Sequence, residues 1–352
     1  MRFKSMPGRP NETISEFRKR RILIPAVYAG IALALLYFCC APVSAQASTA
    51  QAAPAKVPAT RAFTDELGRR VNVPLEANRI VSLAPNLTEI VYALGEADHL
   101  AGDTDFCDYP PEAAQKPHVG GPVNPNLEEI AKLAPDLILA TSINRRETVD
   151  ALDRLGFPVY TIDPHSVDEM IQSVQRLGSV LGAGKSAAPL VASLRARLAD
   201  LDRRLSHAAP RRVLFVVWTD PLISIGRNTF IADALRHAGA QSVVDTAVEW
   251  PHISMEEIVH LQPQALIFAT AHAEDTRRDI DALRTQPGWR DLNALRHGNV
   301  ILVSDAINRP APRMLDAIEQ LARALHPEAF AARAAAPAGP KPVLEEACAC
   351  AR

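Results

Sequence analysis

NLEEIAKLAPDLILAT, at residues 126–141, returns in altered form as SMEEIVHLQPQALIFAT at residues 254–270. Each copy is predicted to begin with a capped helix, which ends at a proline and leads into a buried strand that closes on threonine. The copies differ by one inserted residue, and each stands at the same place in the order of predicted elements. A repeated unit of this kind predicts two lobes built to one design.

Short apolar runs alternate with amphipathic segments on either side of both copies. In the first half of the chain, RIVSLAP (79–85) and PVYTID (158–163) are predicted to be buried strands. In the second half, RVLFVVW (212–218) and NVILVS (299–304) have the same character. Strands that alternate with helices form parallel sheets covered on both faces. The predicted fold class is therefore α/β, with two Rossmann-like lobes that each hold a parallel sheet.

A long amphipathic segment separates the two halves. Within residues 186–207, apolar side chains recur at positions 190, 191, 194, 198, 201 and 205, which is helical spacing. Because it contains no turn sequence, this segment predicts a single long, rigid helix between the lobes. We therefore predict an N-terminal lobe over residues 61–182, a connecting backbone helix over 183–210 and a C-terminal lobe over 211–328.

The start of the chain has the pattern of an export signal. Four basic residues at 18–21 precede an apolar run at 22–40, and the small residues Val43 and Ala45 follow. This arrangement predicts a signal peptide over residues 1–45 that is cleaved after Ala45. The apolar run also approaches the ~20 residues that span a bilayer, so an uncleaved membrane anchor is the alternative. Both interpretations put the folded part outside the cytoplasm.

Two terminal segments have no periodic apolar pattern. Residues 46–60 are rich in alanine, proline and threonine and are predicted to be a disordered linker. Residues 329–352 are predicted to be a disordered tail, and the sequence assigns no role to its Cys348 and Cys350.

The distribution of charge excludes one class of partner. The whole chain has a formal net charge of -2, but residues 1–45 hold seven basic and two acidic side chains, so residues 46–352 carry -7. An acidic protein without a basic stripe is a poor binder of nucleic acid or of anionic lipid. We therefore expect neither as a partner.

The sequence contains no familiar catalytic or metal-binding pattern. It lacks G-x-S-x-G, H-E-x-x-H and G-x-G-x-x-G, and its ten histidines include no pair at i and i+4. We therefore predict neither an enzyme nor a metal site. The opposing hypothesis is an extracytoplasmic α/β enzyme acting between the lobes, which would need Asp105, Asp108 and His165 to meet.

Two glutamates follow the helix cap in each copy of the repeat. The caps are Asn126 and Ser254, and the second glutamate of each pair is expected to complete a capping box. The first glutamate, Glu128 in one copy and Glu256 in the other, is left facing solvent. These two carboxylates are expected either to complement the helix dipole or to form a matched pair that docks on a two-fold symmetric partner.

Aromatic side chains are scarce, at 5% of residues, and three of them fall in predicted loops or at strand ends: Phe106, Trp218 and Trp250. Ligand clefts form beyond the carboxyl ends of parallel strands, where aromatic faces suit a large, flat, partly apolar ligand. Asp305 and Arg309 follow the last predicted strand and are expected either to bond a ligand's amides or to pair with each other. Core packing is the alternative for the tryptophans.

Six motifs spread along both halves resemble a known family: FTDELGRRVNVP, RIVSLAPNLTEIVYALG, DYPP, NLEEIAKLAPDLILA, VEWPHISMEEI and SDAINRPAPR. The family is that of the periplasmic helical-backbone metal-chelate receptors, the class III substrate-binding proteins of ABC importers. The resemblance covers about residues 61–328. It implies two α/β lobes joined by one rigid helix, with a ligand cleft between them and no enzymatic activity. It also implies a monomeric periplasmic protein that delivers its ligand to a membrane permease dimer.

The resemblance implies roles for individual residues. Glu128 and Glu256 match the family's two docking glutamates, which engage arginines on the paired permease subunits. Within the family, the cobalamin-binding members are the most similar in these motifs. They place an aromatic where Phe106 stands and a tryptophan before proline where Trp250 stands.

The same members imply the ligand. Asp305 and Arg309 match their polar residues near the corrin amides, so the expected ligand is a corrinoid such as vitamin B12 (cobalamin). One departure keeps another chelate open, because the aromatic expected before residue 126 is absent and Pro122 and Val123 stand there. Haem or a ferric siderophore is therefore the alternative ligand, with Tyr109 or His165 as the iron contact.

Overall fold

The computed structural model describes residues 59–331, which fall within one compact unit. The predicted signal peptide, Cys348 and Cys350 lie outside the described residues, as do almost all of the predicted linker and tail. The first strand begins at Thr60, which pairs with Pro74, and the last helix ends at Phe330. The folded part thus extends slightly past the predicted bounds. No helix within the described range is both long and apolar enough to cross a membrane.

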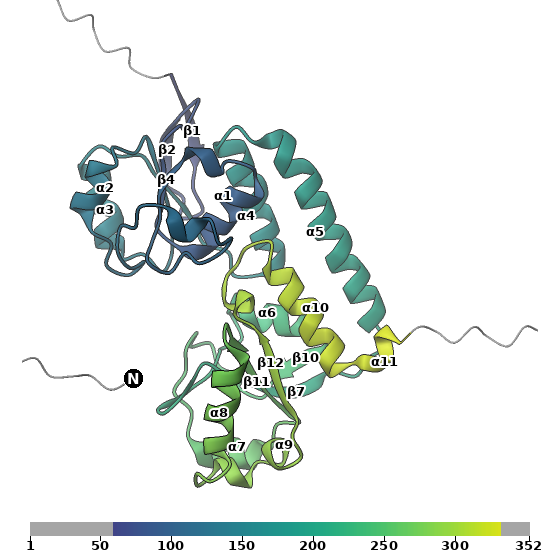
Figure 1. The fold of residues 1–352 in the computed structure, drawn as a ribbon. Coiled ribbons are helices and arrows are strands. Elements are labelled where there is room, and N and C mark those ends of the chain that lie inside the picture. Colours follow the sequence, from purple (N-terminus) through teal and green to yellow (C-terminus); the bar gives the residue numbers. More distant parts are fainter. Residues whose placement is uncertain (1–58, 332–352) are drawn as a thin grey trace, which may run out of the picture. The chain divides into compact units, whose positions relative to one another are not determined.

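The N-terminal lobe is a four-stranded parallel sheet covered by helices (Figure 1). Its strands are β3 (Ile80–Ser82), β4 (Leu100–Gly102), β5 (Leu137–Thr141) and β6 (Val159–Ile162). Its helices are α1 (Pro85–Ala93), α2 (Leu127–Lys132), α3 (Arg146–Arg154) and α4 (Val167–Val180). An antiparallel hairpin of β1 (Thr60–Thr64) and β2 (Arg70–Pro74) precedes them. Every residue of β5 is buried, because helices cover both faces of a parallel sheet.

The C-terminal lobe repeats this architecture. Its parallel strands are β7 (Arg211–Val216), β10 (Ala240–Ser242), β11 (Ala265–Thr270) and β12 (Val300–Ser304). A separate small hairpin consists of β8 (Trp218–Thr219) and β9 (Leu222–Ile223). The helices are α6 (Phe230–His237), α7 (Met255–Leu261), α8 (Ala273–Leu283), α9 (Asn293–Arg296), α10 (Met314–Leu325) and α11 (Pro327–Phe330).

The two main sheets have the same strand order, β4-β3-β5-β6 in one lobe and β10-β7-β11-β12 in the other. In each sheet the second strand along the chain is at one edge, next to the first, and the third and fourth follow. The repeated sequence supplies α2 and β5 in one lobe and α7 and β11 in the other. The prediction of twin Rossmann-like lobes is confirmed. In such a sheet the connections change direction between the first and third strands, and ligands bind beyond the strand ends there.

One helix joins the lobes without interruption. It is α5, which runs from Gly184 to Leu205 and is 22 residues long, or ~33 Å at the usual helical rise. Its buried face consists of Ala187, Val191, Leu194, Leu198, Leu201 and Leu205. These residues belong to a hydrophobic cluster that also contains side chains of α4 in one lobe and of α6 and α10 in the other. This continuous core, rather than a flexible linker, connects the two lobes.

The helix caps of the repeat are formed as predicted, but the capping boxes are not complete. The side chains of Asn126 and Ser254 each accept a hydrogen bond from the backbone three residues on. The reciprocal bond is missing at the first cap, because the Glu129 carboxylate pairs with Lys132 at 2.7 Å instead. A lysine one turn along the helix competes successfully for this carboxylate.

Candidate ligand-binding site

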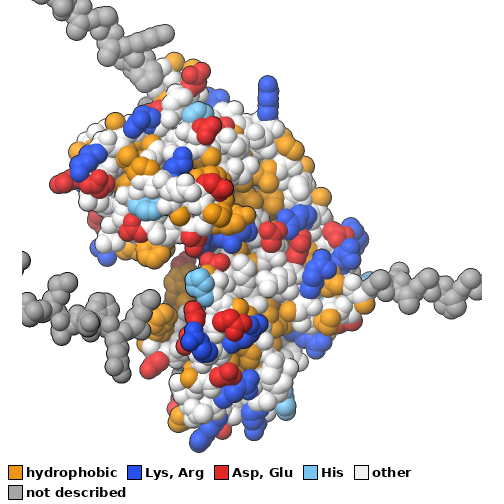
Figure 2. All heavy atoms as spheres, in the orientation of Figure 1, with side chains coloured by type: hydrophobic (Ala, Val, Ile, Leu, Met, Phe, Trp, Pro, Cys, Tyr) orange, Lys and Arg blue, Asp and Glu red, His pale blue; other side chains and the backbone are white. Residues whose placement is uncertain are grey.

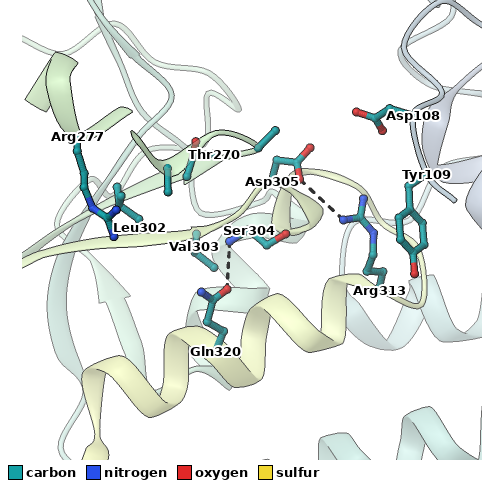
Figure 3. Close-up of a pocket in the computed structure, with 12 residues that line it drawn as sticks. Asp108, Tyr109, Thr270, Arg277, Leu302, Val303, Ser304, Asp305, Arg313 and Gln320 are labelled. Carbon is teal, nitrogen blue, oxygen red and sulfur yellow. Dashed lines mark hydrogen bonds and ion pairs between the residues drawn. The ribbon is translucent and has the colours of Figure 1, made fainter. Parts of the chain in front are cut away.

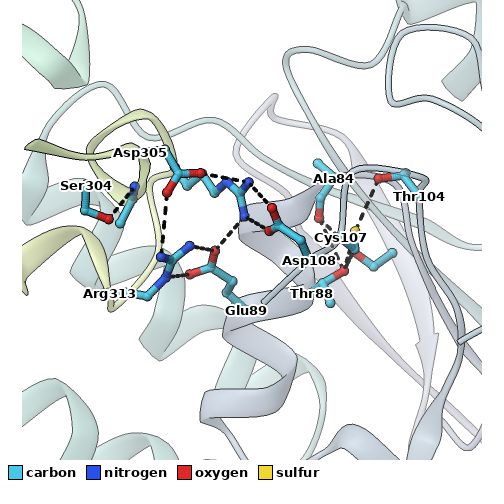
Figure 4. Close-up of polar contacts among 12 residues, drawn as sticks. Ala84, Thr88, Glu89, Thr104, Cys107, Asp108, Ser304, Asp305 and Arg313 are labelled. Carbon is cyan, nitrogen blue, oxygen red and sulfur yellow. Dashed lines mark hydrogen bonds and ion pairs between the residues drawn. The ribbon is translucent and has the colours of Figure 1, made fainter. Parts of the chain in front are cut away.

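Loops from both lobes meet at the carboxyl ends of the strands. Glu89 lies on α1, which follows β3, and Asp108 lies in the loop after β4. Asp305, Arg309 and Arg313 follow β12 in the other lobe. Ion pairs connect these five side chains across the lobes (Figure 4). The carboxyl edges of both sheets therefore border one region, which is where α/β proteins bind ligands.

Glu89 is at the centre of this ion cluster and is 4% exposed. Its Oε1 accepts hydrogen bonds from Arg313 Nη2 at 2.8 Å and from Arg309 Nη1 at 3.2 Å. Its Oε2 accepts a third bond, from Arg313 Nε at 3.1 Å. Arg309 also donates to Asp108 at 3.2 Å and pairs with Asp305 at 3.1 Å. Arg313 Nη1 also lies 3.9 Å from Asp305, so each arginine of the cluster contacts at least two carboxylates.

Three members of the cluster have pKa values shifted by their neighbours. A hydrogen bond from Arg309 lowers the pKa of Asp108 below its ordinary value. Burial acts to lower the pKa of Arg309 and Arg313, but their hydrogen bonds to Asp108 and Glu89 and the nearby carboxylates raise both pKa values overall. These shifts favour the charged forms of Asp108, Arg309 and Arg313.

The sequence left two roles open for Asp305 and Arg309, and the structure shows that they pair with each other. It also shows their partners in the other lobe, which sequence reasoning missed. Glu89 falls within the quoted motif RIVSLAPNLTEIVYALG and has no local feature that distinguishes it from a surface glutamate. Asp108 stands in the quoted motif DYPP, and Arg313 is the last residue of SDAINRPAPR. The sequence analysis therefore quoted both motifs but did not predict the ion pairs that these residues form.

Replacement of Glu89 by glutamine is expected to lower the free energy of unfolding by about 2–3 kcal/mol, because two partly buried arginines lose a shared carboxylate. Urea denaturation measures the change. The matched control is Glu319→Gln, which removes a more exposed carboxylate, 2.9 Å from Arg197. That change is expected to cost less than about 1 kcal/mol. Equal losses in the two variants would contradict a central role for Glu89.

One predicted ligand-binding tryptophan, Trp218, lies in a small hairpin, and the other, Trp250, lies in a segment bridged to it. The expectation that Trp218 ends the first strand of its lobe is wrong, because β7 ends at Val216 and Trp218 begins the β8–β9 hairpin. Trp218 pairs with Ile223, which in turn bridges to His252. Because His252 follows Trp250 by two residues, this bridge brings the segment that carries Trp250 beside β9, the strand that pairs with Trp218. The two tryptophans are 61% and 44% exposed, which overturns the alternative of core packing.

Phe106 is the corresponding exposed aromatic of the N-terminal lobe, with an exposed fraction of 61%. It follows β4, and its ring lies beside Gly121. The next residue, Cys107, is buried against the hydroxyls of Thr88 and Thr104 and anchors this loop. Phe106 is thereby held at the carboxyl edge of its sheet with its ring free to contact a ligand.

Asn144 fixes the remaining loops at this edge. Its buried side-chain amide donates to the carbonyl oxygens of Leu83 at 2.9 Å and Pro122 at 2.7 Å, and it accepts from the N–H of Thr141 at 2.8 Å. These bonds join the loop after β3, the loop before α2 and the end of β5. Val123, which is exposed, follows Pro122. These two residues stand where the resemblance to the cobalamin-binding members led us to expect an aromatic.

A pocket of about 470 Å³ opens beside the ion cluster. Asp108 and Tyr109 line it from one lobe, and the loops after β11 and β12 line it from the other (Figure 3). In the space-filling view the surface is hollowed between the two lobes (Figure 2). Of the predicted ligand contacts, Asp305 lines the pocket, whereas Phe106, Trp218, Trp250 and Arg309 do not. The three aromatics are exposed elsewhere on the surface.

Two of the three residues that the enzyme hypothesis requires are engaged elsewhere. His165 contacts Asp163 at 3.3 Å, and Asp108 bonds to Arg309. Tyr109, a candidate iron contact, lines the pocket with its ring 4.1 Å from the Arg313 guanidinium carbon. Within residues 59–331, no group of three or more histidine, cysteine, aspartate or glutamate side chains is arranged to hold a metal ion.

A buried carboxylate lies at the base of the Phe106 loop. Asp103 is fully buried, and its Oδ1 is 2.8 Å from Nδ1 of His118, whereas its Oδ2 has no partner among the described residues. Burial raises the pKa of Asp103 to about 6, although the hydrogen bond with His118 acts in the opposite direction. The folded state therefore binds this proton more tightly than the unfolded chain does.

This shift predicts a pH dependence of stability. The contribution of Asp103 is fully present below the unfolded pKa near 3.8 and is lost as the pH rises through about 6. Replacement by asparagine should therefore raise the free energy of unfolding at pH 7 relative to pH 4, by about 1–3 kcal/mol compared with wild type. Urea denaturation at both pH values measures this. The exposed neighbour Asp105→Asn is the control, and an equal change in that variant would contradict the assignment.

The geometry is that of a two-lobed binding protein, and comparison with known proteins agrees. A family model described as periplasmic binding protein matches residues 80–306. The chain belongs to the periplasmic binding protein family. This periplasmic binding protein is 31% identical over 315 residues to an uncharacterized ABC transporter substrate-binding lipoprotein of Bacillus subtilis, across 86% of this chain and 98% of the relative.

Two solved structures are similar to this chain in both fold and sequence. The periplasmic vitamin B12-binding protein of Vibrio cholerae has 29% identity and a TM-score of 0.64, covering 73% of this periplasmic binding protein and 99% of the other chain. The periplasmic haem-binding protein of a Roseiflexus species has 28% identity and a TM-score of 0.65, covering 72% and 99%. These two proteins are named for different ligands, vitamin B12 and haem. Their similarity to this chain establishes the class of protein, and the ligand must be inferred from the site.

Membership confirms several predictions made from the sequence. The resemblance to ABC-importer receptors and the α/β two-lobed fold are confirmed, and so is the prediction that the chain is a substrate-binding protein and not an enzyme. A protein of this family works outside the cytoplasm together with a membrane permease.

Proposed function

We propose that this periplasmic binding protein captures a corrinoid of the vitamin B12 class between its lobes and delivers it, as a monomer, to the permease dimer of an ABC importer. The observation that carries the proposal is the exposure of aromatic side chains at the carboxyl edges of both sheets. Phe106 faces solvent on one lobe, and Trp218 and Trp250 do so on the other. Large aromatic faces left in water favour a bulky ligand with extended apolar surface.

The charges of the cleft favour a ligand with amide arms. Arg309 and Arg313 are both held by carboxylates of the protein, so neither guanidinium is available to a carboxylate of the ligand without breaking an existing pair. A corrin ring carries neutral amides, which can bond at the edge of the ion cluster, for example to the free lone pairs of Asp305. Haem carries carboxylates. The carboxylates of the ion cluster would repel these groups, while its arginines would attract them.

The connecting helix supports a preformed cleft. Because α5 is continuous and shares its core with both lobes, the lobes are not expected to close far around a ligand. Little ordering energy is then lost on binding, and affinity depends on complementarity that already exists. Export by the predicted signal over residues 1–45 would place this cleft in the periplasm.

Glu128 and Glu256 are proposed to dock the protein on its permease. Both are exposed, and they occupy equivalent positions on α2 and α7 in the two copies of the repeat. A pair of carboxylates repeated in this way suits a partner with two equivalent basic pockets, as a two-fold symmetric permease dimer provides.

Titration calorimetry with cyanocobalamin tests the proposal. We expect heat that saturates at one ligand per protein, and co-elution of the corrinoid absorbance with the protein on gel filtration. Absence of both would contradict corrinoid capture. The second candidate is haem or a ferric siderophore, which the position of Tyr109 on the pocket wall favours. A Soret-band shift on addition of haem, without a response to cyanocobalamin, would establish the haem alternative.

A further inference from the structure

The pocket extends past the ion cluster, away from the N-terminal lobe. Its far part lies over the carboxyl ends of β11 and β12, and Arg277 of α8, Ser304 and Gln320 of α10 line it there (Figure 3). None of these three side chains contributes to the ion pairs between the lobes. This part of the pocket therefore has a polar lining of its own.

The far part of the pocket presents hydrogen-bond donors. Gln320 Oε1 accepts from the N–H of Ser304 at 3.1 Å, which fixes the amide, while its NH₂ group has no acceptor among residues 59–331. The Ser304 hydroxyl accepts from the N–H of Ala306 and keeps its own hydrogen to donate. Arg277 pairs with Glu274 of its own helix, but this pair is largely exposed and is therefore weak enough to be exchanged.

Donors beside a guanidinium are the chemistry that recognises an anionic oxygen. We propose that this far part is a subsite for an anionic, oxygen-bearing arm of the chelate, bound by the Gln320 amide, the Ser304 hydroxyl and the Arg277 guanidinium. The inference rests on the proposed function and specifies it further. In a cobalamin the arm is the phosphodiester that links the nucleotide to the ring. The ring itself then lies in the open cleft against the aromatics.

The test compares two corrinoids that differ in this arm, cyanocobalamin and dicyanocobinamide, which lacks the nucleotide. Gln320→Glu keeps the acceptor for the Ser304 N–H and replaces the donor by a negative charge. We expect the Kd for cyanocobalamin to rise about 10- to 100-fold, with the Kd for dicyanocobinamide unchanged. Arg277→Gln should act in the same direction, several-fold, because it removes the cation that faces the arm.

Gln286→Glu is the matched control, because it makes the same charge change at an exposed residue. Gln286 follows the C-terminal end of α8 and does not line the pocket. It should leave both affinities unchanged. If Gln320→Glu weakens both corrinoids equally, or neither, the subsite is wrong while corrinoid capture stands. If the wild type binds haem instead, haem and its dimethyl ester replace the two corrinoids, and equal effects on these would again overturn the subsite. Binding of neither chelate would overturn both proposals.

Discussion

Uptake of the ligand is expected to stop when Glu128 and Glu256 are both replaced by lysine, while the affinity for the ligand stays unchanged. Each carboxylate is exposed and takes no part in the ion cluster, so the change is expected to leave the cleft intact. Placing a cation opposite a basic pocket costs several kcal/mol, which corresponds to a loss of transport of at least ~100-fold. Transport of labelled ligand into proteoliposomes that contain the permease, together with calorimetry on the free variant, measures both quantities.

A control variant with the same change of net charge distinguishes an effect on docking from a general effect of charge. Asp168 and Asp275 also lie exposed in the first turns of their helices, α4 and α8, one in each lobe. Their double replacement by lysine changes the net charge and the helix-dipole interactions in the same way. We expect near-normal transport from this control. Survival of uptake in the Glu128→Lys/Glu256→Lys protein would show that these glutamates do not dock.

The second large effect is expected on affinity. Replacement of both Trp218 and Trp250 by alanine should raise the Kd for cyanocobalamin by more than about 100-fold, since a well-placed tryptophan contributes about 2 kcal/mol. Both rings are largely exposed, so the melting temperature should change little. Calorimetry on the single and double variants measures the loss.

The matched control is Leu155→Ala. Leu155 is also an exposed apolar residue, but it follows α3 and precedes β6, so it lies toward the amino ends of the strands. Its removal should leave affinity unchanged. An unaltered Kd in the double tryptophan variant would mean that the ligand does not contact these two tryptophans.

The repeated segment was sufficient to predict the architecture. Its helix, proline and buried strand recur with the same local chemistry, and local pattern decides which elements form. The long apolar stripe of 186–207 likewise predicted α5. The short strands β4 and β10 were missed, because their sequences, LAG and AQS, lack the apolar run that marks the equally short β3.

The contacts that build the site could be predicted from the sequence only in part. Glu89 and Arg309 are 220 positions apart, and no local pattern connects them. Their pairing depends on how two separately folded lobes meet, which is a property of tertiary structure. Trp218 shows a related limit, since the run RVLFVVW looks continuous, and its break after Val216 arises from pairing with β9. For the two tryptophans the sequence left exposure and core packing open, and the structure shows that both are exposed.

The central claim is that a chelate lies between the lobes, at the carboxyl ends of both sheets. Anomalous diffraction at the cobalt edge, from crystals grown with cyanocobalamin, locates the metal directly. We expect a single cobalt peak between Phe106 of one lobe and Trp218 and Trp250 of the other. A cobalt peak on the outer surface of either lobe, or no ordered cobalt in crystals soaked to saturation, would contradict the account.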